Sequence, residues 1–404
     1  MSAGLLNTII ALVILAGVAW ILYRPKVQES DTYKGTVVPL ASIMDVGFIV
    51  FSPIIILLVG WGAPLAMFGL CLLGILTAYA FSYNIRHYEP LVGKPDALHA
   101  WESSADWALI AASIVNNSYY ALLLTTLVLL PLGDLYSVGL AAATAAAVLG
   151  VLAIYGYAKG LAALNEVGNR TTAFNLSAIT AVLVAFAVYN IQQLVGGDFH
   201  WPDYNPTEDA DTLRKLLGLF ALVQGFEASR YLGAYLSADK RIKTMRAAQY
   251  IASVAFVLFI ALSLVLFATV EVPRNATAIF AVSEQVSVFL PFLIMAVAIG
   301  SQLSAIVNGA ESRSDLLTQK LGDRVPRRWT IPLILVPSIL LVLVADVDSA
   351  VALASRTFAL YYLLQAYIAG RLAWRAKSWG WVVFFIGIGL AMAATAVFGI
   401  PSSV

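Results

Sequence analysis

The chain has 404 residues, of which 61% are hydrophobic and only 12% are charged. A soluble domain typically carries about 25% charged residues, so this composition excludes a water-soluble fold. The net charge of +1 gives no general attraction for nucleic acid, which we do not expect as a partner. The single cysteine, Cys71, excludes an intrachain disulfide, and the three histidines form no metal-spaced pair. We therefore expect the lipid bilayer to surround most of the chain, and we expect no metal centre.

Apolar runs long enough to cross a membrane follow one another along the chain. A helical span needs roughly 17 to 25 residues to cross a hydrocarbon core of about 30 Å. The first run, Leu5 to Leu22, has no basic residue before it, and Arg24 and Lys26 follow it, so we interpret it as a retained helix rather than a signal peptide. Eleven further helices are predicted at residues 38–61, 63–83, 106–130, 136–157, 172–194, 213–237, 247–270, 287–320, 329–345, 349–374 and 378–398.

The basic residues indicate how these twelve helices are oriented. If the helices cross alternately, 19 of the 24 Lys and Arg residues fall in loops on one side of the membrane. Three fall on the other side (Arg214, Lys215 and Arg274), and two lie inside helices (Arg230 and Arg356). Because cytoplasmic loops carry the excess of basic residues, the first side is predicted to be the cytoplasm. We expect a multi-pass protein of the cell (inner) membrane with both termini outside the cytoplasm.

The same threading predicts an internal repeat. The five helices that start at residue 38 and the five that start at residue 213 enter the membrane from opposite sides, which is the arrangement of an inverted repeat. We therefore predict an all-α polytopic fold made of a leading helix with its loop (1–35), two five-helix repeats (36–196 and 197–375) and a final helix (376–404).

Transporters with inverted repeats interrupt the first helix of each repeat near the midplane, where free backbone groups line a cavity. Glycine or proline occurs at that depth in both of the corresponding helices here, in Asp45-Val46-Gly47 followed by Ser52-Pro53 and in Gln224-Gly225-Phe226. The sequence predicts unwound segments at 46–52 and 223–229.

Three stretches resemble the amino acid-polyamine-organocation (APC) superfamily, which has the leucine-transporter fold. Gly225-Phe226-Glu227 resembles the Gly-Phe-acid step of the interrupted sixth helix of that family, and residues 311–326 resemble the cytoplasmic end of its eighth helix. The segment 273–287 is also similar. The resemblance covers the ten repeat helices. It departs at Val46-Gly47-Phe48, where the family has a Gly-x-Gly whose amides hold a substrate carboxylate, and in the additional N-terminal helix.

Four charged residues are predicted deep in the membrane, where a charge is costly and marks a functional candidate. They are Asp45, Glu227, Arg230 and Arg356. One interpretation is two structural ion pairs, Glu227 with Arg230 and Asp45 with Arg356. Another is that Asp45 or Glu227 binds a coupling cation or takes up a proton during transport. A third is that the fixed charge of Arg356 replaces a coupling sodium ion.

Polar and aromatic residues near the predicted interruptions complete the candidate site. The resemblance implies that Ser301 and Ser304, three residues apart on one helix face, complete a sodium site with carbonyls of the first interrupted helix. The alternative is that both serines only pack between helices. The residues expected to bind substrate are Asp45, Gly47, Phe48, Asn117, Tyr120, Gly225, Phe226 and Glu227, and those expected to couple ions are Asp45, Glu227, Ser301, Ser304 and Arg356.

The sequence as a whole predicts an alternating-access carrier for a small organic solute, with an amino acid or amine as the leading class. A proton or sodium gradient would drive it, and we expect no cofactor beyond a bound Na⁺ or a transported proton. An inorganic-cation carrier of the same fold is an alternative, although the second interrupted helix offers no Met or His to join Asp45 as a softer ligand. A non-transporting membrane sensor is a second alternative. Nothing in the sequence favours an enzyme, because no His or metal-spaced cluster is predicted at membrane depth.

Overall fold

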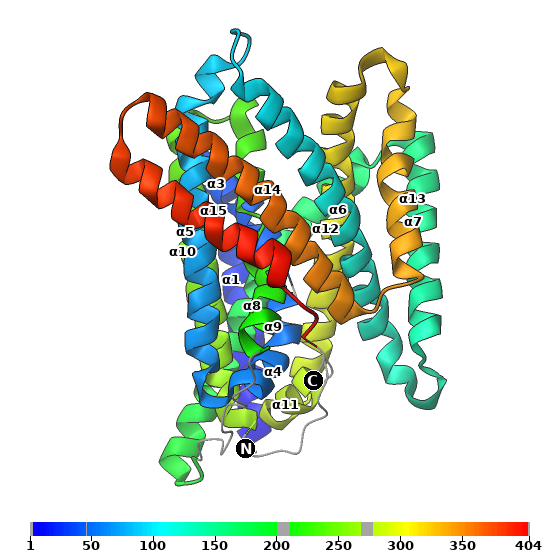
Figure 1. Ribbon diagram of the computed structural model, residues 1–404. Helices are drawn as coiled ribbons and strands as arrows, with labels where there is room; N and C mark the ends of the chain where they lie inside the picture. The colour runs from blue at the N-terminus through cyan, green and yellow to red at the C-terminus, as the bar shows by residue number, and fades with distance from the viewer. Residues whose placement is uncertain (1–2, 46, 200–210, 268–277, 403–404) are drawn as a thin grey trace.

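The described part of the computed structural model comprises residues 3–45, 47–199, 211–267 and 278–402, and it is all-helical (Figure 1). The first half contains α1 (Ala3–Leu22), α2 (Pro25–Gln28), α3 (Asp31–Ile43), α4 (Gly47–Val59), α5 (Ala63–His87), α6 (Leu98–Leu129), α7 (Val138–Lys159) and α8 (Ala162–Gly196). Short 3₁₀ turns η1 (Gly60–Gly62), η2 (Glu89–Leu91) and η3 (Leu130–Leu135) connect some of them.

The second half is helical as well. It contains α9 (Thr212–Gly218), η4 (Phe220–Val223), η5 (Phe226–Ala234), α10 (Ala238–Phe267), α11 (Ala278–Val286), α12 (Phe289–Leu321), η6 (Gly322–Arg324), η7 (Arg327–Trp329), α13 (Thr330–Val342), α14 (Val347–Arg375) and α15 (Trp379–Phe398). Among the described residues, eight helical stretches are long and apolar enough to span a membrane. The all-helical fold is confirmed, while the count of twelve spans and the repeat boundaries stay predictions.

The first repeat begins with a helix interrupted between α3 and α4. Met44 ends α3 with φ −88° and ψ 53°, and α4 begins at Gly47. The predicted unwinding of 46–52 is therefore placed too late, because Gly47 to Ser52 are helical. Pro53 lies inside α4 without breaking it. The Ser52 hydroxyl donates to the Phe48 carbonyl at 2.5 Å, the kind of side-chain bond that supports backbone beside a membrane proline.

The second repeat begins with a helix interrupted within the predicted stretch 223–229, although Val223 and Phe226 to Ser229 are 3₁₀-helical. Gln224 and Gly225 separate η4 from η5, and Gly225 has φ 112°, a left-handed conformation that favours glycine. The helix beyond the break is 3₁₀ rather than α. A Cβ atom on Gly225 would lie 2.6 Å from the Ser42 carbonyl carbon, so this break packs directly against the last turn of α3.

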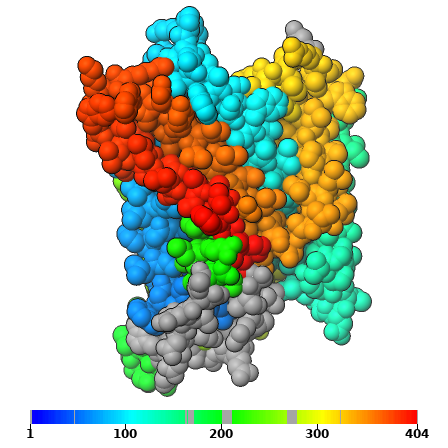
Figure 2. All heavy atoms as spheres, in the orientation of Figure 1, coloured from blue at the N-terminus to red at the C-terminus, as the bar shows by residue number. Residues whose placement is uncertain are grey.

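Packing between helices places these two interruptions in the middle of the molecule. Helix α14 packs on α15 and α6, α12 packs on α8 and α6, and α7 pairs with α13 at one side (Figure 1). Figure 2 shows α14 and α15 running diagonally across one face, with α9 beside the end of α15. The interrupted helices lie inside the group of helices just described, and Phe48 of α4 and Phe220 of η4 are both 0% exposed.

The additional helix α1 is held in place by polar contacts near its start. The Asn7 amide donates to the Val286 carbonyl at 3.0 Å and exchanges hydrogen bonds with Gln192 of α8. The Thr8 and Ser287 hydroxyls lie 2.6 Å apart. Asn7 is 1% exposed, whereas Val13 on the opposite face is 63% exposed, as expected for a helix with one face in lipid. These bonds set which face of α1 packs on α8 and α11.

Candidate transport site

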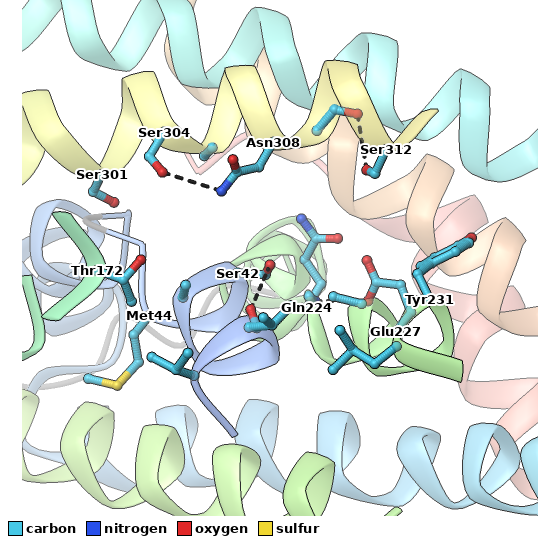
Figure 3. Close-up of a pocket in the computed structure, with 18 of the residues that line it drawn as sticks. Ser42, Met44, Thr172, Gln224, Glu227, Tyr231, Ser301, Ser304, Asn308 and Ser312 are labelled. Carbon is cyan, nitrogen blue, oxygen red and sulfur yellow. Dashed lines mark hydrogen bonds between the residues drawn. The ribbon is translucent and has the colours of Figure 1, made fainter. Parts of the chain in front are cut away.

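A cavity of about 650 Å³ reaches the two interruptions. It is lined by the end of α3, by the Gln224-Gly225 break, and by polar faces of α6, α8 and α12. Figure 3 shows Gln224 and Glu227 on one side of it, with Ser304 and Asn308 of α12 on the other. This volume suits a small solute, and binding pockets for such ligands typically measure about 300 to 1,000 Å³.

The cavity opens toward the end of the molecule where α3 begins and α12 ends. Its outer lining includes Gln28, Tyr33 and Lys34, together with Tyr235, which is 83% exposed. In the opposite direction, buried aromatic side chains of α4 and η4 lie behind it, and Phe51 of α4 is 0% exposed. Among the described residues, the exposed part of the lining therefore lies at the end where α3 begins and α12 ends.

Asp45 occupies the first interruption. Its carboxylate accepts a hydrogen bond from the Gly47 amide at 2.7 Å and another from the Tyr120 hydroxyl, and the residue is 5% exposed. Arg356 does not reach it. Arg356 is exposed, and its Nε donates to the Ala396 carbonyl at 2.8 Å. The predicted Asp45–Arg356 pair is wrong, because Arg356 points to the outside of α14 and packs on α15, so it places no fixed charge in the cavity.

Glu227 occupies the second interruption. Its Oε2 accepts from the Gly225 amide at 3.0 Å and from the Tyr362 hydroxyl at 2.8 Å, while its Oε1 lies 3.9 Å from a guanidinium nitrogen of Arg313. The carboxylate thus turns back toward the break and caps an amide that an unbroken helix would have satisfied. It is directed away from Arg230 for the same reason.

Arg230 pairs elsewhere, so the predicted Glu227–Arg230 pair is also wrong. Its guanidinium donates to Glu102 of α6 at 2.7 Å, and both side chains are 12% exposed. Gln365 of α14 donates to the other Glu102 oxygen at 3.1 Å. This buried acid ties η5 to α6 and α14, and the sequence analysis did not single it out.

The remaining predicted substrate residues divide into two groups. Asn117, Tyr120, Gly225 and Glu227 line the cavity. Asp45, Gly47, Phe48 and Phe226 are not among its lining residues. A Cβ atom on Gly47 would lie 2.3 Å from the Tyr119 hydroxyl, so glycine is needed there for packing.

The two predicted pocket phenylalanines belong to the aromatic core. Phe48 stacks on Phe256 with ring centroids 4.3 Å apart, and Phe226 stacks on Tyr362 at 5.1 Å. Both phenylalanines are 0% exposed. In this conformation they wall the site from behind rather than face the cavity.

Ser301 and Ser304 both line the cavity, beside Thr172 of α8 and close to Met44 at the first interruption (Figure 3). The Asn308 amide donates to the Ser304 hydroxyl at 3.3 Å. Hydroxyl and carbonyl oxygens of this kind are suitable ligands for a hard cation. The sodium assignment itself stays a prediction.

Sequence reasoning missed several polar residues of the cavity. Asn175, Asn308 and Arg313 line it, and Gln224 was noted only as part of a break. On α12 the signal was present, because Ser301, Ser304, Asn308 and Ser312 recur every three or four residues and so share one helix face. Asn175 and Arg313 gave no such pattern, and only the packing of α8 and α12 brings them to the cavity.

Comparisons with known proteins agree with this architecture. The model of a family described as "APC superfamily transporter" matches residues 25–399. A protein of Aquifex aeolicus (strain VF5), described as uncharacterized, is 28% identical over 361 residues, which cover 88% of this chain and 87% of the relative. The solved structure of a Na⁺-coupled sialic acid symporter, in a substrate-bound outward-open state, is similar with a TM-score of 0.55. At 13% identity over 98% of both chains, that likeness concerns the fold alone.

The sequence resemblance, the interrupted helices around a central cavity and the family match therefore agree. The family match starts after α1 and extends to the end of α15, so it includes every element that lines the cavity. The chain belongs to the APC superfamily of transporters.

Proposed function

We propose that this protein is a secondary active transporter that moves a small organic solute, an amino acid or an amine, by alternating access. The observation that carries the proposal is the cavity of about 650 Å³, which reaches both helix interruptions, has polar side chains of α6, α8 and α12 in its lining, and extends to the end of the molecule where α3 begins. A carrier of this fold holds its substrate near the midplane beside such interruptions and exposes the site to one side at a time. Family and fold are those of transporters rather than enzymes.

We further propose that a sodium or proton gradient drives the transport. Asp45 supports this coupling, because among the described residues its carboxylate has uncharged hydrogen-bond donors as partners, the Gly47 amide and the Tyr120 hydroxyl. A cation or a proton arriving there would find an acid that is not paired with an arginine or lysine of the described part of the chain. Ser301 and Ser304 support a sodium ion held between α12 and the first interruption, and Glu227 supplies a carboxylate that lines the same cavity.

The open side of the cavity corresponds to the cytoplasm in this proposal. The loops before α3 and after α12 carry Arg24, Lys26, Arg324, Arg327 and Arg328, and this basic excess is typical of the cytoplasmic side. The protein would then reside in the inner membrane in an inward-facing conformation.

Uptake into proteoliposomes tests the function directly. Purified protein is reconstituted, and radiolabelled amino acids and amines are supplied under an imposed sodium gradient, an imposed pH gradient, or neither. We expect at least one solute to accumulate above its external concentration under one gradient, and to stop accumulating when an ionophore collapses it. If every solute merely equilibrates, coupling is refuted, and if none enters, the transport proposal is refuted as well.

A further inference from the structure

Apart from Gln28 in its outer lining, five amide side chains line the cavity and form what we call the amide cluster. They come from three helices and the second interruption, namely Asn116 and Asn117 of α6, Asn175 of α8, Gln224 of the break and Asn308 of α12. All except Asn308 are at least nine-tenths buried. Figure 3 shows two members, Gln224 and Asn308, on opposite sides of the cavity.

The amide cluster does not hold helices together. Among the described residues, Asn308 bonds only within α12, to Ser304, and Asn116 bonds within α6, to Tyr120. Each of the five keeps a buried amide nitrogen or oxygen without a hydrogen-bond partner in the described part of the chain. Asn117 and Asn175 each approach a glycine of α12: a Cβ on Gly309 would lie 3.2 Å from Asn117 Oδ1, and one on Gly300 would lie 3.5 Å from Asn175 Oδ1.

Unpaired buried amides are costly, which argues for a ligand as their partner. A buried polar group without a partner destabilises the fold, because it has lost its hydrogen bonds to water and gained none. Helix packing in a membrane gains nothing from such groups unless they bond across helices. The hydrogen-bonding capacity of these amides is therefore available to whatever enters the cavity.

Among the described residues, no carboxylate that lines the cavity is free for a cationic ligand. Glu227 lines the cavity, but both its oxygens face partners, namely the Gly225 amide, the Tyr362 hydroxyl and, at 3.9 Å, Arg313. Asp45 does not line the cavity. An ammonium group among these amides would contact uncharged amide dipoles and no carboxylate that is free of other partners. A purely cationic amine is therefore a poor fit for this cavity, because its charge would be buried without a counter-charge.

A side-chain amide offers a donor and an acceptor side by side, and its best uncharged counterpart is a group with the same pattern. We propose that the amide cluster binds a carboxamide or ureido group of the transported solute, so that the substrate is an uncharged or zwitterionic compound bearing that group rather than an amine. This inference rests on the proposed transport function and narrows its substrate class.

Matched solutes test the inference. Thermal stabilisation of the full chain and competition for gradient-driven uptake are measured with glutamine and citrulline, against glutamate, leucine and putrescine. We expect the amide and ureido compounds to act at about tenfold lower concentration than leucine or glutamate, a difference of about 1.4 kcal/mol, comparable to one or two hydrogen bonds.

Variants assign the preference to the cluster. Asn175→Ala and Asn308→Ala should each reduce the preference for glutamine over leucine about tenfold. Asn190→Ala is the matched control on α8, because Asn190 is equally buried, donates to the Leu262 carbonyl and does not line the cavity. It should leave the preference intact.

The outcomes separate this inference from the transport function. The inference is overturned if a gradient drives uptake of leucine, glutamate or putrescine to the same extent as uptake of the amide compounds, or if the two variants keep the preference. The proposed transport function is unaffected by either result. If no solute moves under either gradient, both are overturned.

Discussion

Gly225 shows how a single residue sets the geometry of the site. Its φ of 112° is rarely adopted by residues with a side chain, and an added Cβ would lie 2.6 Å from the Ser42 carbonyl carbon. We expect Gly225→Ala to lower the free energy of unfolding by at least the 1 to 3 kcal/mol roughly typical of a strained backbone, and to abolish uptake. Melting curves in detergent measure the first effect.

Gly69→Ala is the control for that measurement. Gly69 lies inside α5 with open space around its Cβ position, so alanine there should stabilise the protein by about 0.5 to 1 kcal/mol. Equal melting temperatures for the two variants would show that the break tolerates a side chain.

At Asp45 the charge and the hydrogen bonds can be separated. Asparagine keeps an oxygen that can accept from the Gly47 amide, 2.7 Å away, so Asp45→Asn should fold and melt like the parent chain. It removes the negative charge, and we expect gradient-driven uptake to fall at least tenfold. Proteoliposome uptake alongside melting curves measures both. Normal uptake in a folded Asp45→Asn protein would make Asp45 structural, and Ser301 and Ser304 would be the next candidates for coupling.

Among the elements, η5 is the one whose attachment the structure reassigns. Arg230 of η5 pairs with Glu102 of α6 and not with Glu227, and Gln365 of α14 completes the contact. Removing one partner of a buried pair costs about 3 to 5 kcal/mol, because the remaining charge is left uncompensated. We therefore expect Glu102→Gln to destabilise the fold by about this amount.

Glu227→Gln is the comparison that discriminates between the two pairings. It leaves the Arg230–Glu102 bond of 2.7 Å intact and should destabilise the protein less, while reducing transport. From the sequence alone, Glu227 is the expected partner of Arg230. Glu227→Gln would then leave Arg230 unpaired and would be the more destabilising change. The free energy of unfolding is measured for both variants. A larger decrease for Glu227→Gln than for Glu102→Gln would contradict the pairing in the structure.

At the scale of the whole molecule, the basic loops predict the orientation in the membrane. Of the 24 basic residues, 19 are predicted on the cytoplasmic side, and the twelfth helix takes the chain back across the membrane. A reporter fused after residue 404 should therefore lie outside the cytoplasm. Paired fusions to an enzyme active only in the periplasm and to one active only in the cytoplasm measure this. A reporter that is active in the cytoplasm would overturn the threading by one helix.

Much of the architecture could be predicted from the sequence, because apolar runs and basic loops are local signals. The ends of the predicted helix 287–320 lie within two residues of those of α12 at Phe289 and Leu321. The break at Gly225 was predictable as well, since a glycine within an apolar run carries its own conformational preference. The first break was misplaced because Pro53, a strong local signal, is accommodated inside α4.

What the sequence by itself determined is therefore the membrane class, the helices, the family resemblance and the second interruption, all of which depend on neighbouring residues in the chain. Only the tertiary structure decided the partners of the buried charges and the lining of the cavity. Arg230 finds Glu102 at a separation of 128 residues, and Asn117, Asn175 and Asn308 meet at one cavity from three helices. Side-chain direction across helices depends on how each helix is rotated against its neighbours, and a helix's own sequence does not fix that rotation.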